Sequence, residues 1–515
     1  MDGKIFKKLN QPYMKRTSGM RIKQYLFTII FIVSFVFYTK ACADETSRAN
    51  FIIIYADDMG YADAGPFGDP KINTPAIDAL VENGQTWTNF YATAPVCTPS
   101  RGALLTGKLP VRTGLYGDTI SVFFPGSKQG LPHREKTIAE VFQDNKYSTG
   151  MFGKWHLGDA PAFYPTRHGF DEWLGIPYSN DMDWEIDGVN FGNIFTPPEG
   201  APAKWKTVAP RIRKNIFKRE ITDWQVPLIS SQHLNDGTFK DTLLEKPANQ
   251  NLITKRYTEE SVRFIAESVE KNKPFFLFLS HSMPHVPLFR SPDFVNKSQQ
   301  GIYGDVIEEI DWGVGEILSS LKRLNINSNT YVIFTSDNGP WLLFGDHAGS
   351  AKPLRDGKGT TFEGGMRAMT MFSGPGIKPG IVSEIGVQTD LFTTLLSLAE
   401  ITDFPLPQDS FDLTGALLKG EQSPRDFVPF YRGSELRAFR VNEHKIHFIT
   451  EGAYNRPPKK QFHSTPLLIN LNENIGERED LLTNDKAITA KLIERATRFQ
   501  QSFEKAPSIL DRQFQ

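Results

Sequence analysis

Three short, uninterrupted apolar runs stand out along the chain, at residues 51–55, 275–279 and 331–335. They are rich in β-branched and aromatic residues, which is typical of strands buried on both faces of a sheet. Apolar residues at helical spacing lie between them. They predict helices between Thr74-Pro75 and Gly84, from Thr258 onward, and from about residue 305 to 324. Alternating strands and helices predict an α/β fold with a mostly parallel sheet flanked by helices.

The last hundred residues show a different pattern. Apolar and polar residues alternate at 436–441 and 445–449, around a turn at Asn442, and a third apolar run lies at 467–471. A charged helix is expected at about 486–504. This pattern predicts a smaller C-terminal subdomain, an antiparallel sheet with one helix. We therefore expect a main domain over residues 44–415 and the smaller subdomain over residues 416–515.

The N-terminus has the pattern of an export signal. Basic residues between positions 15 and 23 precede an apolar run at 25–38, and the small residues Ala41 and Ala43 follow it. The run is shorter than the roughly 20 residues that a membrane-spanning helix needs. We expect a signal peptide at residues 1–43, export to the periplasm or the medium, and no stable membrane span after cleavage. A membrane anchor is the alternative. Lipid attachment through Cys42 is disfavoured because the residues before it lack the usual leucine.

Charge and cysteine content exclude two classes of protein. Lys and Arg total 58 and Asp and Glu total 59, so the net charge of -1 gives no sign of nucleic-acid binding. Cys97 is the only cysteine after the expected cleavage site, which excludes an internal disulfide scaffold. One segment, residues 201–220, is strongly basic, with a single acid, Glu220. This segment either lines a site that binds a polyanion or is a solvated loop.

Polar residues follow each of the three expected strands. They are Asp57 and Asp58, then His281 and His285, then Asp337 and Asn338. Ligands of open α/β sheets bind beyond the carboxyl ends of the strands, so these side chains are expected at one edge. The oxygens of Asp57, Asp58, Asp337 and Asn338 suit a hard cation, calcium or magnesium. The absence of clustered thiolates and the flexible number of oxygen ligands favour calcium.

The sharpest motif runs from Cys97 to Gly114 and reads CTPSRGALLTGKLPVRTG. It strongly resembles the active-site signature of type I, formylglycine-dependent sulfatases. Five further blocks resemble those of the same family in the same order: 57–61, 153–158, 281–285, 336–339 and 357–365. Each block alone has an ordinary structural explanation, but six together in family order do not. The resemblance covers about residues 48–475 and leans toward the branch of arylsulfatase A and N-acetylgalactosamine-6-sulfatase.

The resemblance implies an alkaline-phosphatase-like fold, hydrolysis of sulfate esters, a bound Ca²⁺ and a maturation enzyme that oxidises Cys97 to formylglycine (3-oxoalanine). One hydroxyl of the hydrated aldehyde attacks sulfur, and the second allows sulfate to leave. The remaining roles also come from the resemblance. Arg101 orients the nucleophile, Lys154 and Lys358 hold sulfate oxygens, His285 protonates the leaving alcohol, and His156 assists loss of the second proton.

The sequence says less about the substrate than about the reaction. We expect sulfated sugars or polysaccharides, with algal glycans such as ulvan or carrageenan as one case. His347, Arg355 and Asp181 are candidates for the sugar subsite because flanking loops often set specificity on a fixed scaffold. Two alternatives stay open: a phosphodiesterase or phosphonate hydrolase of the same superfamily, and a glycan-binding protein without turnover. The second would apply if Cys97 stays a thiol.

Overall fold

The structure is a computed structural model that describes residues 48–68, 71–186, 189–190, 210–212, 214–217, 223–479, 482 and 484–515. The expected signal peptide, including Cys42, and most of the basic segment 201–220 lie outside these residues and stay predictions. Within the described part of the chain, no helix has both the length and the apolarity needed to cross a membrane.

The main sheet has ten strands in the order β12-β2-β11-β10-β1-β9-β3-β4-β7-β8. Their bounds are β1 (Asn50–Ala56), β2 (Gln85–Tyr91), β3 (Ser148–Gly153), β4 (Glu172–Gly175), β7 (Leu228–His233), β8 (Phe239–Glu245), β9 (Phe275–Ser280), β10 (Thr330–Ser336), β11 (Thr370–Ser373) and β12 (Gly380–Val387). The five central strands from β10 to β4 are parallel, and antiparallel pairs join them on both sides. The three apolar runs are β1, β9 and β10, so the predicted α/β sheet is confirmed.

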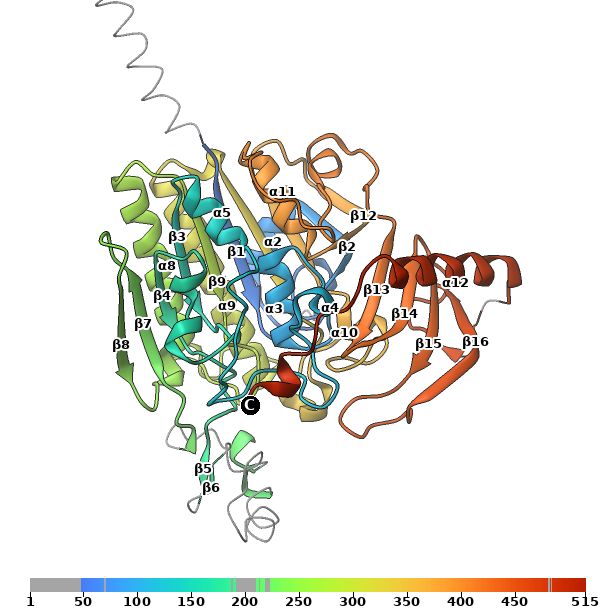
Figure 1. The fold of residues 1–515 in the computed structure, drawn as a ribbon. Coiled ribbons are helices and arrows are strands. Elements are labelled where there is room, and N and C mark those ends of the chain that lie inside the picture. Colours follow the sequence, from blue (N-terminus) through green and yellow to red (C-terminus); the bar gives the residue numbers. More distant parts are fainter. Residues whose placement is uncertain are drawn as a thin grey trace, which may run out of the picture. The chain divides into compact units, whose positions relative to one another are not determined.

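Helices cover both faces of this sheet (Figure 1). The helices of this part of the chain are α2 (Pro75–Glu82), α3 (Cys97–Thr106), α4 (Pro110–Thr113), α5 (Ile138–Asp144), α8 (Ile253–Glu270), α9 (Gly301–Arg323), α10 (Glu363–Met366) and α11 (Asp390–Leu398). Successive residues of β1 point to opposite faces. Ile52 and Ile54 join the core under α2, α8 and α9, whereas Phe51 and Ile53 join the core under α3, α5 and α11. This two-sided burial explains why β1 is apolar throughout.

Two helix starts were predicted too late. The helix expected from Thr258 begins at Ile253, and the one expected from about residue 305 begins at Gly301. Neither start has a side chain that caps the first turn. The usual sequence signal of a helix N-terminus is therefore missing at both places.

The C-terminal residues form a four-stranded antiparallel sheet with one helix packed on it. Its elements are β13 (Phe427–Arg432), β14 (Glu435–Val441), β15 (His444–Thr450), β16 (Gln461–Asn470) and α12 (Lys486–Gln501). The predicted sheet and helix are confirmed, but β13 was missed. Pro429 interrupts its pattern, and an edge strand such as β13 tolerates proline. A separate two-stranded sheet pairs β5 (Glu185–Ile186) with β6 (Val189–Asn190). The division at residues 415/416 stays a prediction.

A buried ion pair ties the start of the C-terminal region to α11. The Arg425 guanidinium donates to both carboxylate oxygens of Asp390 at 2.6 Å, and both side chains are almost fully buried. Removal of one partner would leave the other charge buried and uncompensated, which costs far more than the loss of an exposed pair.

We predict that Arg425→Met lowers the free energy of unfolding by about 3–5 kcal/mol. The matched control is Lys419→Met, which removes an exposed lysine 3.8 Å from Glu421. It should change stability by less than about 0.5 kcal/mol. Urea denaturation of both variants measures the difference. Equal effects would show that the Arg425–Asp390 pair does not hold the C-terminal region to α11.

Candidate active site

The loops after four parallel strands meet at the carboxyl edge of the main sheet, as expected for an open α/β fold. Asp57 and Asp58 follow β1, Lys154 follows β3, His285 lies in the loop after β9, and Asp337 follows β10. Main-chain bonds hold the loops side by side: the Asp57 amide donates to Met283 O at 3.2 Å, and the Asp337 amide donates to Ala56 O at 3.1 Å. Side chains nearly 300 residues apart in sequence therefore share one buried site.

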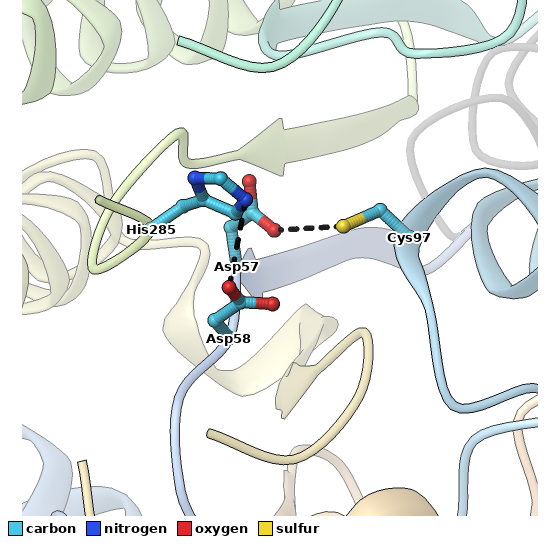
Figure 2. Close-up of side chains that lie close together, drawn as sticks. All are labelled: Asp57, Asp58, Cys97 and His285. Atoms are coloured by element: carbon cyan, nitrogen blue, oxygen red, sulfur yellow. Dashed lines mark hydrogen bonds and ion pairs between the residues drawn. The ribbon is translucent and has the colours of Figure 1, made fainter. Parts of the chain in front are cut away.

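Cys97 is the first residue of α3 and lies inside this site (Figure 2). Its Sγ is 3.4 Å from Asp57 Oδ1 and 3.4 Å from Lys358 Nζ. Burial and the neighbouring carboxylates of Asp337 and Asp57 raise the pKa of the thiol well above its usual value. Since the thiolate is the reactive form of cysteine, the unmodified side chain is a poor nucleophile here.

Three carboxylates and three cationic side chains form the core of the site. Lys154 Nζ lies 2.5 Å from Asp57, Lys358 Nζ 2.7 Å from Asp58, and Arg101 Nη2 2.9 Å from Asp337. All six are buried. We refer to them below as the charge cluster. Because buried ions need partners, each member fixes the place of another.

Burial opposes ionisation of all three carboxyl groups, but the net shifts of their pKa values differ. It opposes ionisation of Asp57, but Lys154 and Arg101 outweigh it and hold the pKa well below its usual range. For Asp337, burial and the neighbouring Asp57 raise the pKa to about 7. Burial also raises the pKa of Asp58. Burial and neighbouring carboxylates favour the neutral form of such groups. A cation bound between them would stabilise the ionised form.

The residues predicted to hold calcium fit a hard cation. Asn338 Nδ2 donates to Asp58 Oδ1 at 2.7 Å, whereas the buried Asn338 Oδ1 has no hydrogen-bond partner in the described part of the chain. One ligand atom each of Asp57, Asp58, Cys97 and His285 lies within 4.8 Å of the others. An unsatisfied amide oxygen beside buried carboxylates is the donor set that Ca²⁺ prefers over softer metals.

Arg101 links several loops of the site. Its Nη1 donates to Lys154 O at 3.0 Å and to Ser280 Oγ at 2.7 Å, and its other nitrogens donate to Asp337. The fork of donors thus joins α3 to the ends of β3, β9 and β10. Substitution of this arginine would disturb all of these elements at once.

The predicted histidines occupy different positions. His285 Nε2 lies 3.2 Å from Ser179 Oγ and 3.5 Å from Asp58 Oδ2, and its Nδ1 lies 2.6 Å from Val286 O. Because a carbonyl only accepts, Nδ1 carries the proton of the neutral ring. His156 is buried with a φ of 61°, and its Nε2 donates to Phe123 O at 2.9 Å. Burial lowers the pKa of both rings well below the usual value.

The three residues predicted for the sugar subsite have different surroundings. Burial raises the pKa of Asp181 to about 6, while the charges of Lys358 and Lys154 oppose the shift, so Asp181 lies near the cluster. The His347 ring packs edge-on against Phe217 at 4.8 Å. Arg355 donates to Glu477 O at 2.8 Å and to Glu479 at 3.3 Å. The roles of all three stay predictions.

Sequence reasoning missed three residues of the site: Ser179, Trp341 and Tyr454. Ser179 Oγ accepts from Lys154 Nζ at 3.0 Å. The Trp341 ring lies 4.5 Å from Lys358 Nζ and 5.1 Å from the Tyr454 ring. Ser179 and Trp341 are close in sequence to predicted residues, which was an available signal. Tyr454 follows β15 in the C-terminal sheet, and no local pattern marks it.

Comparison with known proteins identifies the family. A family model of the sulfatases matches residues 49–401, and a model of the C-terminal region of aryl-sulfatases matches residues 423–515. Arylsulfatase A of Homo sapiens is 35% identical over 472 residues, which cover 88% of this chain and 87% of that protein. N-acetylgalactosamine-6-sulfatase of Canis lupus familiaris is 36% identical over 410 residues, which cover 78% of this chain and 72% of that protein.

Solved structures of sulfatases resemble this chain. The PsFucS1 sulfatase from Pseudoalteromonas sp. matches with a TM-score of 0.75 at 25% identity, covering 91% of this chain and 93% of that one. Ps i-CgsB in complex with k-i-k-neocarrahexaose matches with a TM-score of 0.68 at 28% identity, covering 90% and 94%. Family models, relatives and folds lead to one conclusion: this chain belongs to the sulfatase family and is a sulfuric ester hydrolase.

Proposed function

We propose that this protein is an exported, calcium-dependent sulfatase that removes sulfate from sugars after Cys97 has been converted to formylglycine. The observation that carries the proposal is the position of Cys97 between Asp57 and Lys358, at 3.4 Å from each. The charge cluster surrounds that position with cations for a sulfate group and with oxygens for a metal.

The unmodified thiol suits this chemistry poorly, because burial and nearby carboxylates keep it protonated. Hydrated formylglycine supplies two hydroxyls on one carbon, one to attack sulfur and one to release the sulfate. Asp57 Oδ1 is within reach of a hydroxyl at position 97 as an acceptor, and Lys358 Nζ is within reach as a donor. These two side chains orient the nucleophile and Arg101 holds Asp57 in place from 3.6 Å.

Lys154 and Lys358 are proposed to bind the sulfate oxygens. Both ammonium groups are buried in the charge cluster, where a fixed positive charge stabilises an anion more strongly than it does in water. Asp57, Asp58, Asp337 and Asn338 are proposed to hold Ca²⁺. When bound there, the cation supplies a Lewis acid that polarises a sulfate oxygen.

His285 is proposed to donate a proton to the leaving alcohol. Its Nδ1 proton is fixed on Val286 O, so Nε2 is the nitrogen that gains and loses a proton. A bound sulfate favours the charged imidazolium, since an opposite charge nearby raises the pKa of a histidine. A poor leaving group such as a sugar hydroxyl needs this proton.

Sugars are the proposed substrates because one group of relatives and one similar structure are named with sugars. One relative is named for N-acetylgalactosamine 6-sulfate chemistry, and one similar structure holds a neocarrahexaose. Asp181, with a buried Oδ1 that lacks a partner among the described residues, is a proposed acceptor for a sugar hydroxyl. His347 and Arg355 complete the proposed subsite. Algal glycans such as ulvan or carrageenan are one case of this class.

The first prediction from the proposed function concerns the modification of Cys97. In protein exported by its native host, the tryptic fragment 72–101 should weigh about 18 Da less than the cysteine form, as conversion of the thiol to an aldehyde requires. Mass spectrometry measures this directly. Cys97→Ala, which cannot be converted, should lose a factor on the order of 10⁴ or more in kcat. A fully unmodified thiol in active protein would falsify the covalent mechanism.

The second prediction concerns calcium. A Ca²⁺ concentration about 100 times the Kd should stabilise the protein by about 2.7 kcal/mol, seen as a rise in Tm over the EDTA-treated protein. Asn338→Ala removes the unpartnered oxygen and should reduce this rise. Asn472→Ala, an exposed asparagine outside the site, is the control and should keep it. Equal rises in both variants would contradict the assigned ligand set.

The third prediction separates the role of His285 by leaving group. His285→Ala should lower kcat on a sugar sulfate by about 10²–10⁴-fold, the usual contribution of a general acid. The loss on 4-nitrophenyl sulfate should be much smaller, because nitrophenolate leaves without a proton. The comparison variant is His281→Ala, a buried histidine of the same loop. It should affect both substrates alike. Equal losses in His285→Ala would exclude proton donation by this residue.

A further inference from the structure

The segment after α12 returns to the main domain, as the dark red end of the chain in Figure 1 shows. Residues 505–515 lie along the loop at residues 115–130, which contains no helix or strand. The main-chain groups of such a loop cannot pair within a regular element, yet buried N–H and C=O groups need hydrogen-bond partners. Side chains of residues 505–515 supply several of these partners.

Asp511 holds the first part of the 115–130 loop. Its Oδ2 accepts from the amide of Asp118, and its Oδ1 accepts from the amides of Thr119 and Ile120, each at 2.9 Å. Ser508 Oγ donates to the same carboxylate at 2.9 Å. A carboxylate that accepts from three consecutive amides fixes the course of the main chain there.

Gln513 holds the middle of the loop and is completely buried. Its Oε1 accepts from the Phe124 amide at 2.7 Å, and its Nε2 donates to Val122 O at 3.1 Å. Its main-chain O accepts from the Lys128 amide at 2.7 Å. The side-chain amide thus pairs with the residues on both sides of Phe123, so it fixes the orientation of the Phe123 main chain.

Phe123 connects this arrangement to the active site. Its O accepts from His156 Nε2 at 2.9 Å, and its amide donates to Thr98 Oγ1 at 3.2 Å. Thr98, which follows Cys97, donates to His156 O at 2.9 Å. Because a carbonyl only accepts, the neutral His156 ring carries its proton on Nε2, and Nδ1 is the basic nitrogen. This Nδ1 is buried and has no hydrogen-bond partner in the part of the chain that the structure describes.

We propose that Gln513 is a positioning residue for the release of sulfate. It holds Phe123 O in place, and through this carbonyl it keeps the His156 ring in the orientation in which Nδ1 accepts a proton. The inference rests on the proposed function and on the role that the sequence predicts for His156.

The step concerned is the second half of the reaction. The second hydroxyl at position 97 gives its proton to His156 Nδ1, and its O–H electron pair forms the carbonyl bond. The C–O bond to sulfate breaks, and its electron pair leaves with the sulfate. The imidazolium then passes the proton to water. A misplaced His156 ring slows this half alone, because the proposed attack on sulfur uses other side chains.

Single-turnover kinetics test the inference. Gln513→Met removes both side-chain hydrogen bonds and keeps a side chain of similar length. With formylglycine-containing protein in excess over labelled 4-nitrophenyl sulfate, nitrophenol release should stay within about twofold of the wild-type rate, whereas sulfate release should slow on the order of tenfold. Gln515→Met, the same change at an exposed glutamine, should alter neither rate. Equal decreases of both rates, or no decrease of sulfate release, would overturn the inference.

The His156 ring gives a second measurement that does not depend on activity. NMR of the full chain with isotope-labelled histidine distinguishes protonated from unprotonated ring nitrogens, and His156→Gln identifies the signals of this ring. Wild type and Gln515→Met should carry the proton on Nε2, whereas Gln513→Met should show a mixture of the two neutral forms.

Asp511→Asn is the milder variant for this measurement, because it loses only one acceptor atom at a half-buried position. It should shift the mixture in the same direction by a smaller amount. A proton that stays on Nε2 in both Gln513→Met and Asp511→Asn would overturn the inference. Formylglycine-containing wild-type protein that hydrolyses no sulfate ester would instead overturn the proposed function.

Discussion

The burial of three aspartates at the carboxyl edge of one sheet is the constraint on which the rest of the structure depends. Three ionised carboxyl groups so close together are unstable in a protein interior unless cations lie beside them. Arg101 pairs with Asp337, Lys154 with Asp57 and Lys358 with Asp58. Asn338 Nδ2 also donates a hydrogen bond to Asp58. These partners come from α3, from the loops after β3 and β10, and from the loop before α10. The cluster thus determines how segments far apart in sequence pack around the ends of β1 and β10.

A second group of buried charges extends this constraint to the C-terminal sheet. Lys445 of β15 lies 3.0 Å from Glu363 and 2.8 Å from Glu477, and all three side chains are fully buried. Glu363 begins α10, five residues after Lys358. Glu477 also accepts from His447 at 2.7 Å. The C-terminal sheet is therefore not an independent addition. It holds the loop that carries Lys358, and it contributes Tyr454 to the surroundings of the site.

The parts of the molecule that could be predicted are those encoded by neighbouring residues. β1, β9 and β10 could be predicted because burial on both faces requires an unbroken apolar run. The residues after them could be placed together because parallel strands end at one edge. β13 was missed because Pro429 breaks its pattern, and the start of α8 was misplaced because no side chain caps it. Trp341 and Tyr454 could not be paired in advance, since a ring contact of 5.1 Å between residues far apart in the sequence leaves no trace in local sequence.

The charge balance of the site supports the proposed divalent metal. When all three carboxyl groups are ionised, the three carboxylates and three cations of the cluster cancel, and burial keeps the ring of His285 neutral. A sulfate ester carries one negative charge, so its entry into this balanced site would leave a buried excess of negative charge. A divalent cation held by Asp57, Asp58, Asp337 and Asn338 would bring the balance to two positive charges, which one sulfate monoanion would only partly neutralise. The remaining positive charge would favour a nucleophile that has lost its proton.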